Sequence, residues 1–322
     1  MTMHNTSEEG EAKRRAKPVD RVHLSDLTPR DFYHTYKRHG IAVVLQGFLD
    51  GVEDWDLPFL SSQIGKRPFT IRCYGEGHFD RPRREWKQYC EHREMTFDVY
   101  ADMLRTHEAH RTRAYLAQMP VGETPLVRSI EPALARVAEF GHFVPVAASA
   151  NWNLWLGPGG HTEPMHFDTG DGTLMQLHGA KIVDLFPASE VYNVHPFDFY
   201  DTLPPWVSRV DFDRLDFKVF PRMRQAMLEY RRVRIDRGDL LFIPAGWWHE
   251  VTSEGDDYSC SLNRFWRVQP LRRNFATRRL ALFYFLNKIP WKAVLAMDRG
   301  MRRLLGREVV AAKPAKDPSG KN

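Results

Sequence analysis

Three side chains that bind metals are spaced so that they could share one ion: His166, Asp168 and His249. His166 and Asp168 are two residues apart in an HFD segment, and positions i and i+2 of a β-strand point to the same face. His249 closes the segment GDLLFIPAGWWH, about eighty residues later. Two imidazoles and one carboxylate leave the opposite face of an ion open, which suits ferrous iron that must bind a cosubstrate and dioxygen together. The sequence therefore predicts an iron centre.

The segment around His249 carries most of the evidence, because a His and an Asp two residues apart also occur by chance in solvated turns. A turn precedes an apolar run from Leu240 to Ile243, and a Pro-Ala-Gly turn follows it. This pattern predicts a buried strand and a second turn that presents the histidine. We expect Trp247 and Trp248 to form aromatic walls that exclude water from the metal. Three further histidines are expected to be surface or structurally satisfied residues: His161, His178 and His195.

These segments resemble the JmjC branch of the cupin superfamily, in particular its bacterial cupin-like group and the asparagine hydroxylase that modifies hypoxia-inducible factor. The resemblance covers roughly residues 22–267. In that family a lysine follows the first metal histidine by fifteen residues in a Gly-x-Lys turn, and Gly179 and Lys181 match it here. Tyr115 opens a matching Tyr-Leu-x-Gln segment, and Asn263 precedes a Phe-Trp pair with one residue inserted. Such proteins are iron(II)- and 2-oxoglutarate-dependent oxygenases on a double-stranded β-helix.

The resemblance implies a cosubstrate role for each of these residues. 2-Oxoglutarate would chelate iron through its 1-carboxylate and 2-keto oxygens, and its far carboxylate would need a partner because burying an unpaired anion is costly. Lys181 would supply the counter-charge, Tyr115 a neutral donor, and Asn263 a hydrogen bond to the iron-bound end or the keto acid. The family's threonine three residues before the metal histidine is replaced by Glu163, which leaves Thr162 as the hydroxyl candidate. Either Glu163 points away from the cosubstrate or the pocket is rearranged.

The composition is that of a globular protein. The chain has 322 residues, of which 43% are hydrophobic and 12% aromatic, enough for one large core or two modest domains. It contains no apolar run long enough to span a membrane, and its first residues lack the apolar stretch of a secretory signal. Cys73, Cys90 and Cys260 are widely spaced, which argues against a disulfide framework and fits a reducing compartment. We therefore expect a cytoplasmic protein.

The net charge of +5 is unevenly distributed. Residues 267–322 carry 14 Lys and Arg against 3 Asp and Glu, a balance of +11. The remaining residues carry 32 against 38, a balance of −6. The basic character therefore belongs to the C-terminal part and not to the expected catalytic body, which weakens any argument from charge for a nucleic-acid partner.

The order of predicted elements indicates a mainly β protein. We expect a double-stranded β-helix, or jelly roll, flanked by N-terminal α/β elements and C-terminal helices. Residues 1–21 are charged and nonperiodic and are expected to be a disordered lead. The catalytic domain is expected over residues 22–267, with the barrel over about 147–266. Thr28 and Pro29 are expected to start an N-terminal helix.

Two segments depart from the barrel pattern. An insert over about 188–229 interrupts the strands, and it is expected to be either a surface decoration or a lid that contacts the substrate. Residues 268–309 have a helical period with an apolar stripe, which predicts a packing or homodimerisation segment, as the resemblance also suggests. Contact of this basic amphipathic segment with an anionic membrane or RNA has less support. Residues 310–322 are expected to be a disordered tail.

The leading interpretation is an iron(II)/2-oxoglutarate-dependent dioxygenase that hydroxylates an unactivated C–H bond of an amino-acid side chain in a peptide or protein. Alternatives within this class are hydroxylation of a small natural-product metabolite, N-methyl-lysine demethylation and modification of a tRNA base. A non-catalytic cupin-like binding module would have no reason to keep the metal residues together with Lys181. A metal-dependent isomerase, or a dioxygenase that uses no keto acid, would generally carry three histidines and lack the lysine.

Overall fold

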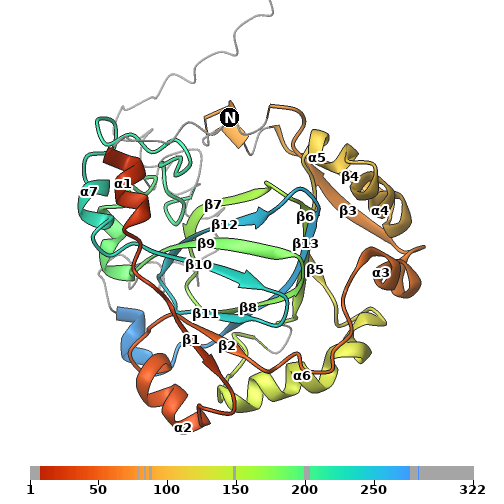
Figure 1. The fold of residues 1–322 in the computed structure, drawn as a ribbon, viewed down its shortest axis with the longest axis horizontal. Coiled ribbons are helices and arrows are strands. Elements are labelled where there is room, and N and C mark those ends of the chain that lie inside the picture. The colour runs from red at the N-terminus through yellow and green to blue at the C-terminus, as the bar shows by residue number, and fades with distance from the viewer. Residues whose placement is uncertain are drawn as a thin grey trace, which may run out of the picture.

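Two β-sheets face each other in the computed structural model, which describes residues 8–77, 80–82, 85–86, 89–147, 150–198, 204–275 and 282 (Figure 1). The larger sheet has nine strands, in the order β1 (Asp20–His23), β2 (Val43–Gln46), β11 (Leu240–Ile243), β8 (Asp171–His178), β13 (Tyr258–Trp266), β6 (Asn153–Pro158), β5 (Ala114–Pro120), β3 (Pro68–Cys73) and β4 (Glu91–Thr96). The smaller sheet has four, in the order β10 (Arg231–Asp236), β9 (Ala180–Phe186), β12 (Trp248–Glu254) and β7 (Thr162–Phe167). This confirms the predicted mainly β jelly roll.

The strands alternate their side chains between the interior of the jelly roll and its outside. On β9, Val183 and Leu185 face the interior, whereas Phe186 faces out. One end of the interior is filled by apolar side chains from both sheets: Ala42, Val44, Leu174, Val183, Leu185, Val233, Ile235, Leu241, Ile243 and Trp247. The other end carries polar side chains and forms the candidate site, so the apolar end closes the interior behind it.

Helices cover the outer face of the larger sheet (Figure 1). They are α2 (Pro29–Phe32), which continues as η1 (Tyr33–Lys37), α3 (Leu57–Ile64), α4 (Phe97–Arg105), α5 (Glu108–Thr112) and α6 (Leu126–Phe140). Their apolar faces and the outward side chains of the strands form a large buried cluster that includes Trp55 and Trp266. As expected, Thr28 caps α2, since its Oγ1 accepts a hydrogen bond from Asp31 N at 3.1 Å.

The insert over residues 188–229 covers the outer face of the smaller sheet. Its helices are η4 (Ala188–Tyr192) and α7 (Met223–Ala226). Apolar side chains of the insert pack on Trp248 and Phe186 of the sheet, and the rings of Phe186 and Phe212 meet edge to face with centroids 5.6 Å apart. The insert therefore shares a buried apolar cluster with the outer face of the smaller sheet.

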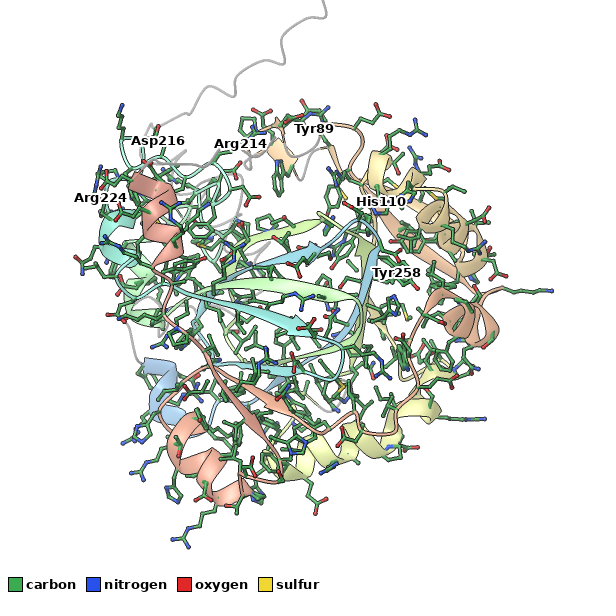
Figure 2. The ribbon with its side chains drawn as sticks, in the orientation of Figure 1. Tyr89, His110, Arg214, Asp216, Arg224 and Tyr258 are labelled. Carbon is green, nitrogen blue, oxygen red and sulfur yellow. The ribbon has the colours of Figure 1, made fainter. Side chains whose placement is uncertain are left out.

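The N-terminal residues form a helix from Glu8 onward, so the predicted disordered lead over residues 1–21 is wrong for the part that the structure describes. Helix α1 (Glu8–Arg14) lies against the insert (Figure 1), and its Ala12 packs on the apolar cluster of the insert. Glu8 forms an ion pair with Arg224, which is labelled in Figure 2. Two charges of this segment, those of Glu8 and Lys17, are therefore paired with the insert, a tertiary effect that a local charge pattern does not reveal.

The described chain continues past the barrel through η5 (Leu271–Phe275) and includes the single later residue Leu282. The predicted C-terminal helices within 268–309 and the predicted tail over 310–322 otherwise lie outside the described residues. Within the described part, no helix is both long enough and apolar enough to cross a bilayer.

Candidate metal centre

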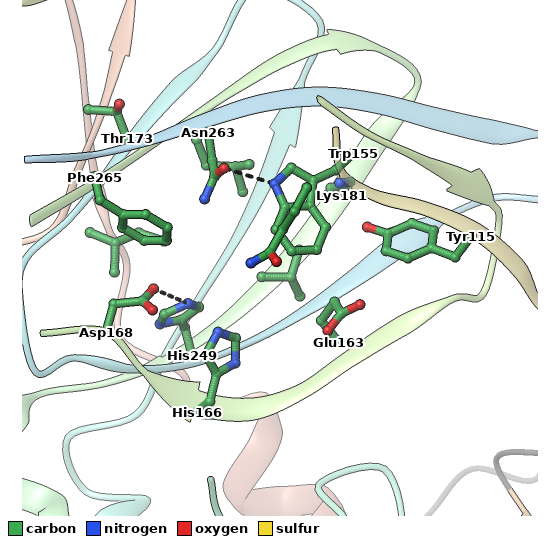
Figure 3. A pocket seen from close by; sticks show the side chains of 15 residues that line it. Tyr115, Trp155, Glu163, His166, Asp168, Thr173, Lys181, His249, Asn263 and Phe265 are labelled. Atoms are coloured by element: carbon green, nitrogen blue, oxygen red, sulfur yellow. Dashed lines mark hydrogen bonds and ion pairs between the residues drawn. The ribbon is translucent and has the colours of Figure 1, made fainter. Parts of the chain in front are cut away.

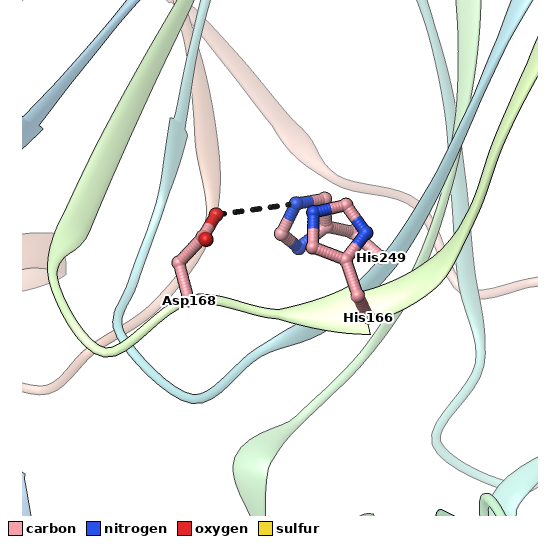
Figure 4. Close-up of side chains that lie close together, drawn as sticks. All are labelled: His166, Asp168 and His249. Atoms are coloured by element: carbon pink, nitrogen blue, oxygen red, sulfur yellow. Dashed lines mark ion pairs between the residues drawn. The ribbon is translucent and has the colours of Figure 1, made fainter. Parts of the chain in front are cut away.

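His166, Asp168 and His249 lie together at the polar end of the interior (Figure 4). Each offers one ligand atom, and these atoms all lie within 4.8 Å of one another. His249 Nε2 is 3.6 Å from Asp168 Oδ2, and the centroids of the two imidazole rings are 4.3 Å apart. The cause is strand pairing, because β7 and β12 are antiparallel neighbours in which His166 is the direct partner of His249. The structure thus brings the three predicted ligands together.

Each histidine is oriented by a nearby backbone carbonyl. His166 Nδ1 lies 2.7 Å from Pro164 O, and His249 Nδ1 lies 3.0 Å from Trp247 O. A carbonyl only accepts hydrogen bonds, so Nδ1 carries the proton and Nε2 keeps its lone pair for a metal. Burial lowers the pKa of His249 to about 3, an effect increased by His166 and opposed by the Trp247 carbonyl. His249 is therefore neutral at neutral pH, as a metal ligand must be.

A β-bulge in β7 decides which side chains before His166 reach the interior. Glu163 is the strand partner of Val251. Three residues later His166 is the partner of His249, which is only two residues from Val251. The extra residue on β7 turns Glu163 to the same face as His166. Thr162 does not line the cavity, and its hydroxyl forms a hydrogen bond of 3.0 Å with a threonine hydroxyl of β12, so its role as a cosubstrate ligand stays a prediction without support from its position.

A cavity of about 100 Å³ lies beside the metal ligands and is lined by both sheets (Figure 3). Lys181 of β9 lines it and is only 2% exposed. Its Nζ donates a hydrogen bond to Ser261 Oγ at 2.6 Å, the one partner it has among the described residues. Burial lowers the pKa of Lys181 to about 8, although Cys260 and Glu163 oppose this shift. The buried ammonium therefore has two N–H groups left for an anionic ligand.

Tyr115 of β5 lines the same cavity, and its hydroxyl points into it (Figure 3). Its ring stacks on that of His161, with centroids 3.7 Å apart. Gly157 leaves room for the ring, because a Cβ there would lie 2.1 Å from Tyr115 Cδ2. Burial raises the pKa of Tyr115 well above its ordinary value, so the hydroxyl stays protonated and can donate. His161 is only 2% exposed and supports Tyr115, so it belongs to the site rather than to the surface.

Asn263 of β13 also lines the cavity, and its Oδ1 accepts a hydrogen bond from Trp155 Nε1 at 2.9 Å. This bond orients the amide and leaves its Nδ2 for a ligand. Ser261, which holds Lys181, lies two residues before Asn263 on the inward face of the same strand. That i, i+2 spacing is the signal that could have identified Ser261. The sequence patterns also did not identify Trp155.

The two tryptophans next to His249 do not line the cavity. Trp248 is buried on the outer face of β12 against Phe167, because adjacent residues of a strand point to opposite faces. Trp247 lies in the apolar end of the interior and donates its Nε1–H to Gly40 O at 2.9 Å. The expected aromatic wall from this pair is therefore wrong. Aromatic lining comes from other strands: Tyr115, Trp155 and Phe265.

A wider groove of about 480 Å³ opens beside the cavity. Groove and cavity share four lining residues: Gln118, Trp155, Glu163 and His166. Its outer walls include Arg72 and Tyr74 on one side and Trp206 of the insert on another. Trp206 is held along the edge of β7, since its carbonyl accepts a hydrogen bond from Phe167 N at 3.0 Å. The groove therefore leads from the surface to the metal ligands, and the insert supplies part of its wall.

Glu163 lies on the boundary between the cavity and the groove. Its Oε1 is 3.4 Å from His161 Nε2 and 4.0 Å from a guanidinium nitrogen of Arg72. Burial by itself raises the pKa of Glu163, but the hydrogen bond from His161 and the charge of Arg72 outweigh it and leave the pKa below its ordinary value. Glu163 is therefore a carboxylate at neutral pH, and it faces the cavity rather than away from it.

The residues present fit an iron(II) ion and 2-oxoglutarate. Two imidazoles and a carboxylate on one side of an ion are the donor set of non-haem iron(II) sites with open positions. Lys181 supplies a buried cation that has no carboxylate within ion-pair distance among the described residues. A buried charge without a partner is costly, which favours an anionic ligand in this cavity.

Comparison with known proteins assigns the chain to a family, since it matches the family described as "Cupin-like domain" over residues 29–272. The chain belongs to this cupin-like family. JMJ30 of Arabidopsis thaliana, a lysine-specific demethylase, is 28% identical over 234 residues, which cover 71% of the cupin-like chain and 51% of that protein. Lysine-specific demethylase 8 of Danio rerio is 32% identical over 261 residues, 78% of the chain and 58% of that protein. The tRNA wybutosine-synthesizing protein 5 of Gallus gallus is 25% identical over 281 residues, 80% of each chain.

These matches confirm the resemblance to JmjC proteins that the sequence motifs indicate. The cupin-like chain spans about half the length of JMJ30.

We expect the cupin-like protein to bind one divalent ion per chain at the three ligands. Asp168→Ala and His249→Ala should each weaken binding of Mn(II) by more than about a hundredfold, because losing even an outer partner of a ligand costs about ten- to a hundredfold. Titration of metal-free protein followed by electron paramagnetic resonance measures this affinity. His178→Ala is the control, since that imidazole pairs with Asp54 at 2.9 Å and does not line the cavity. Equal affinities for all three variants would contradict the site.

Proposed function

We propose that this protein is an iron(II)- and 2-oxoglutarate-dependent dioxygenase that hydroxylates an unactivated C–H bond of an amino-acid side chain in a peptide or protein. The observation that carries this proposal is the buried Lys181 ammonium. It shares one cavity with the metal ligands and has two N–H groups without acceptors among the described residues. A three-histidine cupin that uses no keto acid would have no use for a cation at this depth.

The chain's own residues divide the work of binding. Lys181 pairs with the far carboxylate of 2-oxoglutarate, and Tyr115 donates a neutral hydrogen bond to it. The free Nδ2 of Asn263 is available to the iron-bound end of the cosubstrate. Iron bound by the three ligands supplies the activation of dioxygen that a C–H bond requires. The apolar end of the interior excludes bulk water from the reacting groups.

The groove beside the cavity is the proposed seat of the substrate. It reaches the metal ligands at His166, and its volume of about 480 Å³ exceeds that of the inner cavity. Trp155 and Trp206 offer apolar contact area on its walls. Two of the relatives named above are lysine-specific demethylases, which supports a side chain of a polypeptide as the substrate.

A base in tRNA is the second candidate. The wybutosine-synthesizing relative matches over 80% of both chains, a more complete match than that of either demethylase named above. The balance of +11 in residues 267–322 is the feature of this chain that would favour RNA. The described barrel has no comparable excess of Lys and Arg, so a peptide or protein remains the proposed substrate.

The central experiment measures the conversion of 2-oxoglutarate to succinate. Purified protein with iron(II), oxygen and a peptide or protein extract should convert 2-oxoglutarate to succinate and add one oxygen atom to a substrate, detected by mass spectrometry. Asp168→Ala should abolish both signals, and N-oxalylglycine should suppress them. Release of formaldehyde would identify demethylation instead, and an oxygen gain in tRNA alone would favour the second candidate. An iron-loaded protein that yields no succinate with any of these substrates would contradict the proposal.

Lys181 should make 2-oxoglutarate binding dependent on pH. The ammonium form binds the carboxylate, and its pKa is about 8, so the KM for 2-oxoglutarate should be constant below this pH and rise above it. Lys181→Met should raise the KM roughly tenfold to a hundredfold at neutral pH and remove this rise, because a charged hydrogen bond contributes about 1.5–3 kcal/mol. Steady-state kinetics across pH measure both effects. The neighbouring Cys260 does not titrate here, since burial raises the pKa of its thiol far above this range. A KM in Lys181→Met that keeps the wild-type pH profile would exclude this role.

Glu163 should oppose binding of the same cosubstrate. Its carboxylate lines the cavity, so replacing it by the neutral amide in Glu163→Gln should lower the KM for 2-oxoglutarate about fivefold. This change corresponds to roughly 1 kcal/mol of binding free energy. The comparison is made slightly below neutral pH, where Lys181 is protonated in both forms. Glu254→Gln is the matched control, because that exposed carboxylate of β12 pairs with Arg234 outside the cavity. An unchanged KM in Glu163→Gln would mean that the carboxylate serves the groove and not the cosubstrate.

A further inference from the structure

The turns that carry the metal ligands are tied to each other. One turn joins β7 to β8 and contains Asp168. The other joins β11 to β12 and ends just before His249. Gly246 N donates to Asp168 O at 2.8 Å, and Ala245 N donates to Asp171 Oδ1 at 3.0 Å. The position of Asp168 relative to His249 therefore depends on how firmly these two turns are held together.

Asp171 is a fully buried carboxylate at the centre of this contact. Its partner is Arg273, which lies after the last strand of the barrel and belongs to η5. Arg273 Nη2 lies 2.8 Å from Asp171 Oδ1, and Arg273 Nη1 lies 2.9 Å from Asp171 Oδ2. The side chain of Arg273 is only 10% exposed. This is a two-point ion pair in a low-dielectric setting, where geometry is well defined and loss of one partner leaves an uncompensated charge.

The segment that carries Arg273 is fixed from a second side. Lys37 Nζ donates to Gln269 Oε1 at 3.1 Å and to the carbonyls of Gly141 and His142. Gly40 allows the guanidinium to approach, because a Cβ at this left-handed position would lie 2.9 Å from Arg273 Nε. The segment after β13 therefore packs against the turns of the metal centre and is held there by Arg273 and Gln269.

We propose that Arg273 is a positioning residue of the metal centre: its ion pair with Asp171 holds the two ligand-bearing turns in the arrangement that binds the ion. Arg273 does not line the cavity and touches no ligand atom. It acts through Asp171 and the backbone N–H of Ala245. The segment following the barrel is thereby a working part of the site. The inference rests on the metal centre of the proposed function but not on 2-oxoglutarate chemistry.

Co(II) alone is the probe that tests this inference, because its visible absorption reports both affinity and ligand geometry. Arg273→Met should weaken Co(II) binding by about ten- to a hundredfold, as loss of an outer-sphere partner generally does. It should also shift the Co(II) absorption at saturation. Arg272→Met is the matched control. The side chain of Arg272 is exposed, so this substitution should leave both the Co(II) affinity and the absorption unchanged. Circular dichroism and thermal melting of the metal-free proteins identify the variants that fold.

Chemical rescue distinguishes positioning from general stability. Low-millimolar guanidinium chloride should restore part of the Co(II) affinity of Arg273→Met and have no effect on Arg272→Met. Arg273→Lys keeps the charge but not the two-point geometry, so it should fall between wild type and Arg273→Met. Where Arg273→Met does not fold, Arg273→Lys decides the question in its place.

A folded Arg273 variant with wild-type Co(II) affinity and spectrum would overturn the inference. Failure of the wild-type protein to bind Co(II) would instead contradict the metal centre and with it the proposed function. If Co(II) binding depends on Arg273 but no 2-oxoglutarate is consumed, the positioning role stands and the proposed function fails. The two ideas are therefore separable by experiment.

Discussion

Antiparallel pairing of β7 with β12 is the constraint on which the metal centre depends. The direct pair of His166 and His249 brings the two imidazoles to one face. Because side chains alternate along a strand, a slip of either strand by one residue would turn its own histidine outward. The opposite faces of the same strands carry Phe167 and Trp248, which the insert buries. Apolar packing outside the smaller sheet therefore fixes the register that directs the metal ligands inward.

Three polar side chains at the polar end of the interior are hydrogen-bonded in the same partial way. Each of the three uses part of its hydrogen-bonding capacity within the protein and keeps the rest for a ligand. His249 uses Nδ1 on a carbonyl and keeps Nε2, Asn263 uses Oδ1 on Trp155 and keeps Nδ2, and Lys181 uses one of three N–H groups on Ser261. Such partial satisfaction fixes orientation before any ligand arrives, at the cost of leaving polar groups unpaired in a low-dielectric interior. Glu163 is different, since its oxygens make only long contacts on the boundary with the groove.

The sequence predicts the jelly roll and the three candidate metal ligands that the structure brings together, through strand patterns, ligand spacing and the resemblance to the cupin superfamily. Strand alternation, Gly and Pro turns and the spacing of ligand residues can be read directly from the chain. The faces on which Thr162 and Glu163 lie cannot be predicted from the sequence. A bulge of a single residue exchanges these faces, and it has no signature in composition. The aromatic wall expected from the tryptophans beside His249 is absent because residues adjacent in a strand point to opposite faces, and Trp247 packs in the apolar end of the interior. Helix α1 has no signal in its own residues, because it packs on the insert and pairs Glu8 with Arg224, which is far away in the sequence.

The turns around the ligands explain why a distant residue has to help build this site. Gly170 lies between Asp168 and Asp171, and Gly246 of the other turn adopts a left-handed backbone with φ +80. Glycine turns have the greatest conformational freedom of any backbone, so they do not by themselves hold a ligand to within a fraction of an ångström. The barrel strands end before these turns and do not restrain them through their ladders. A buried two-point ion pair supplies the missing restraint, and Arg273 is located where it can reach both turns through Asp171.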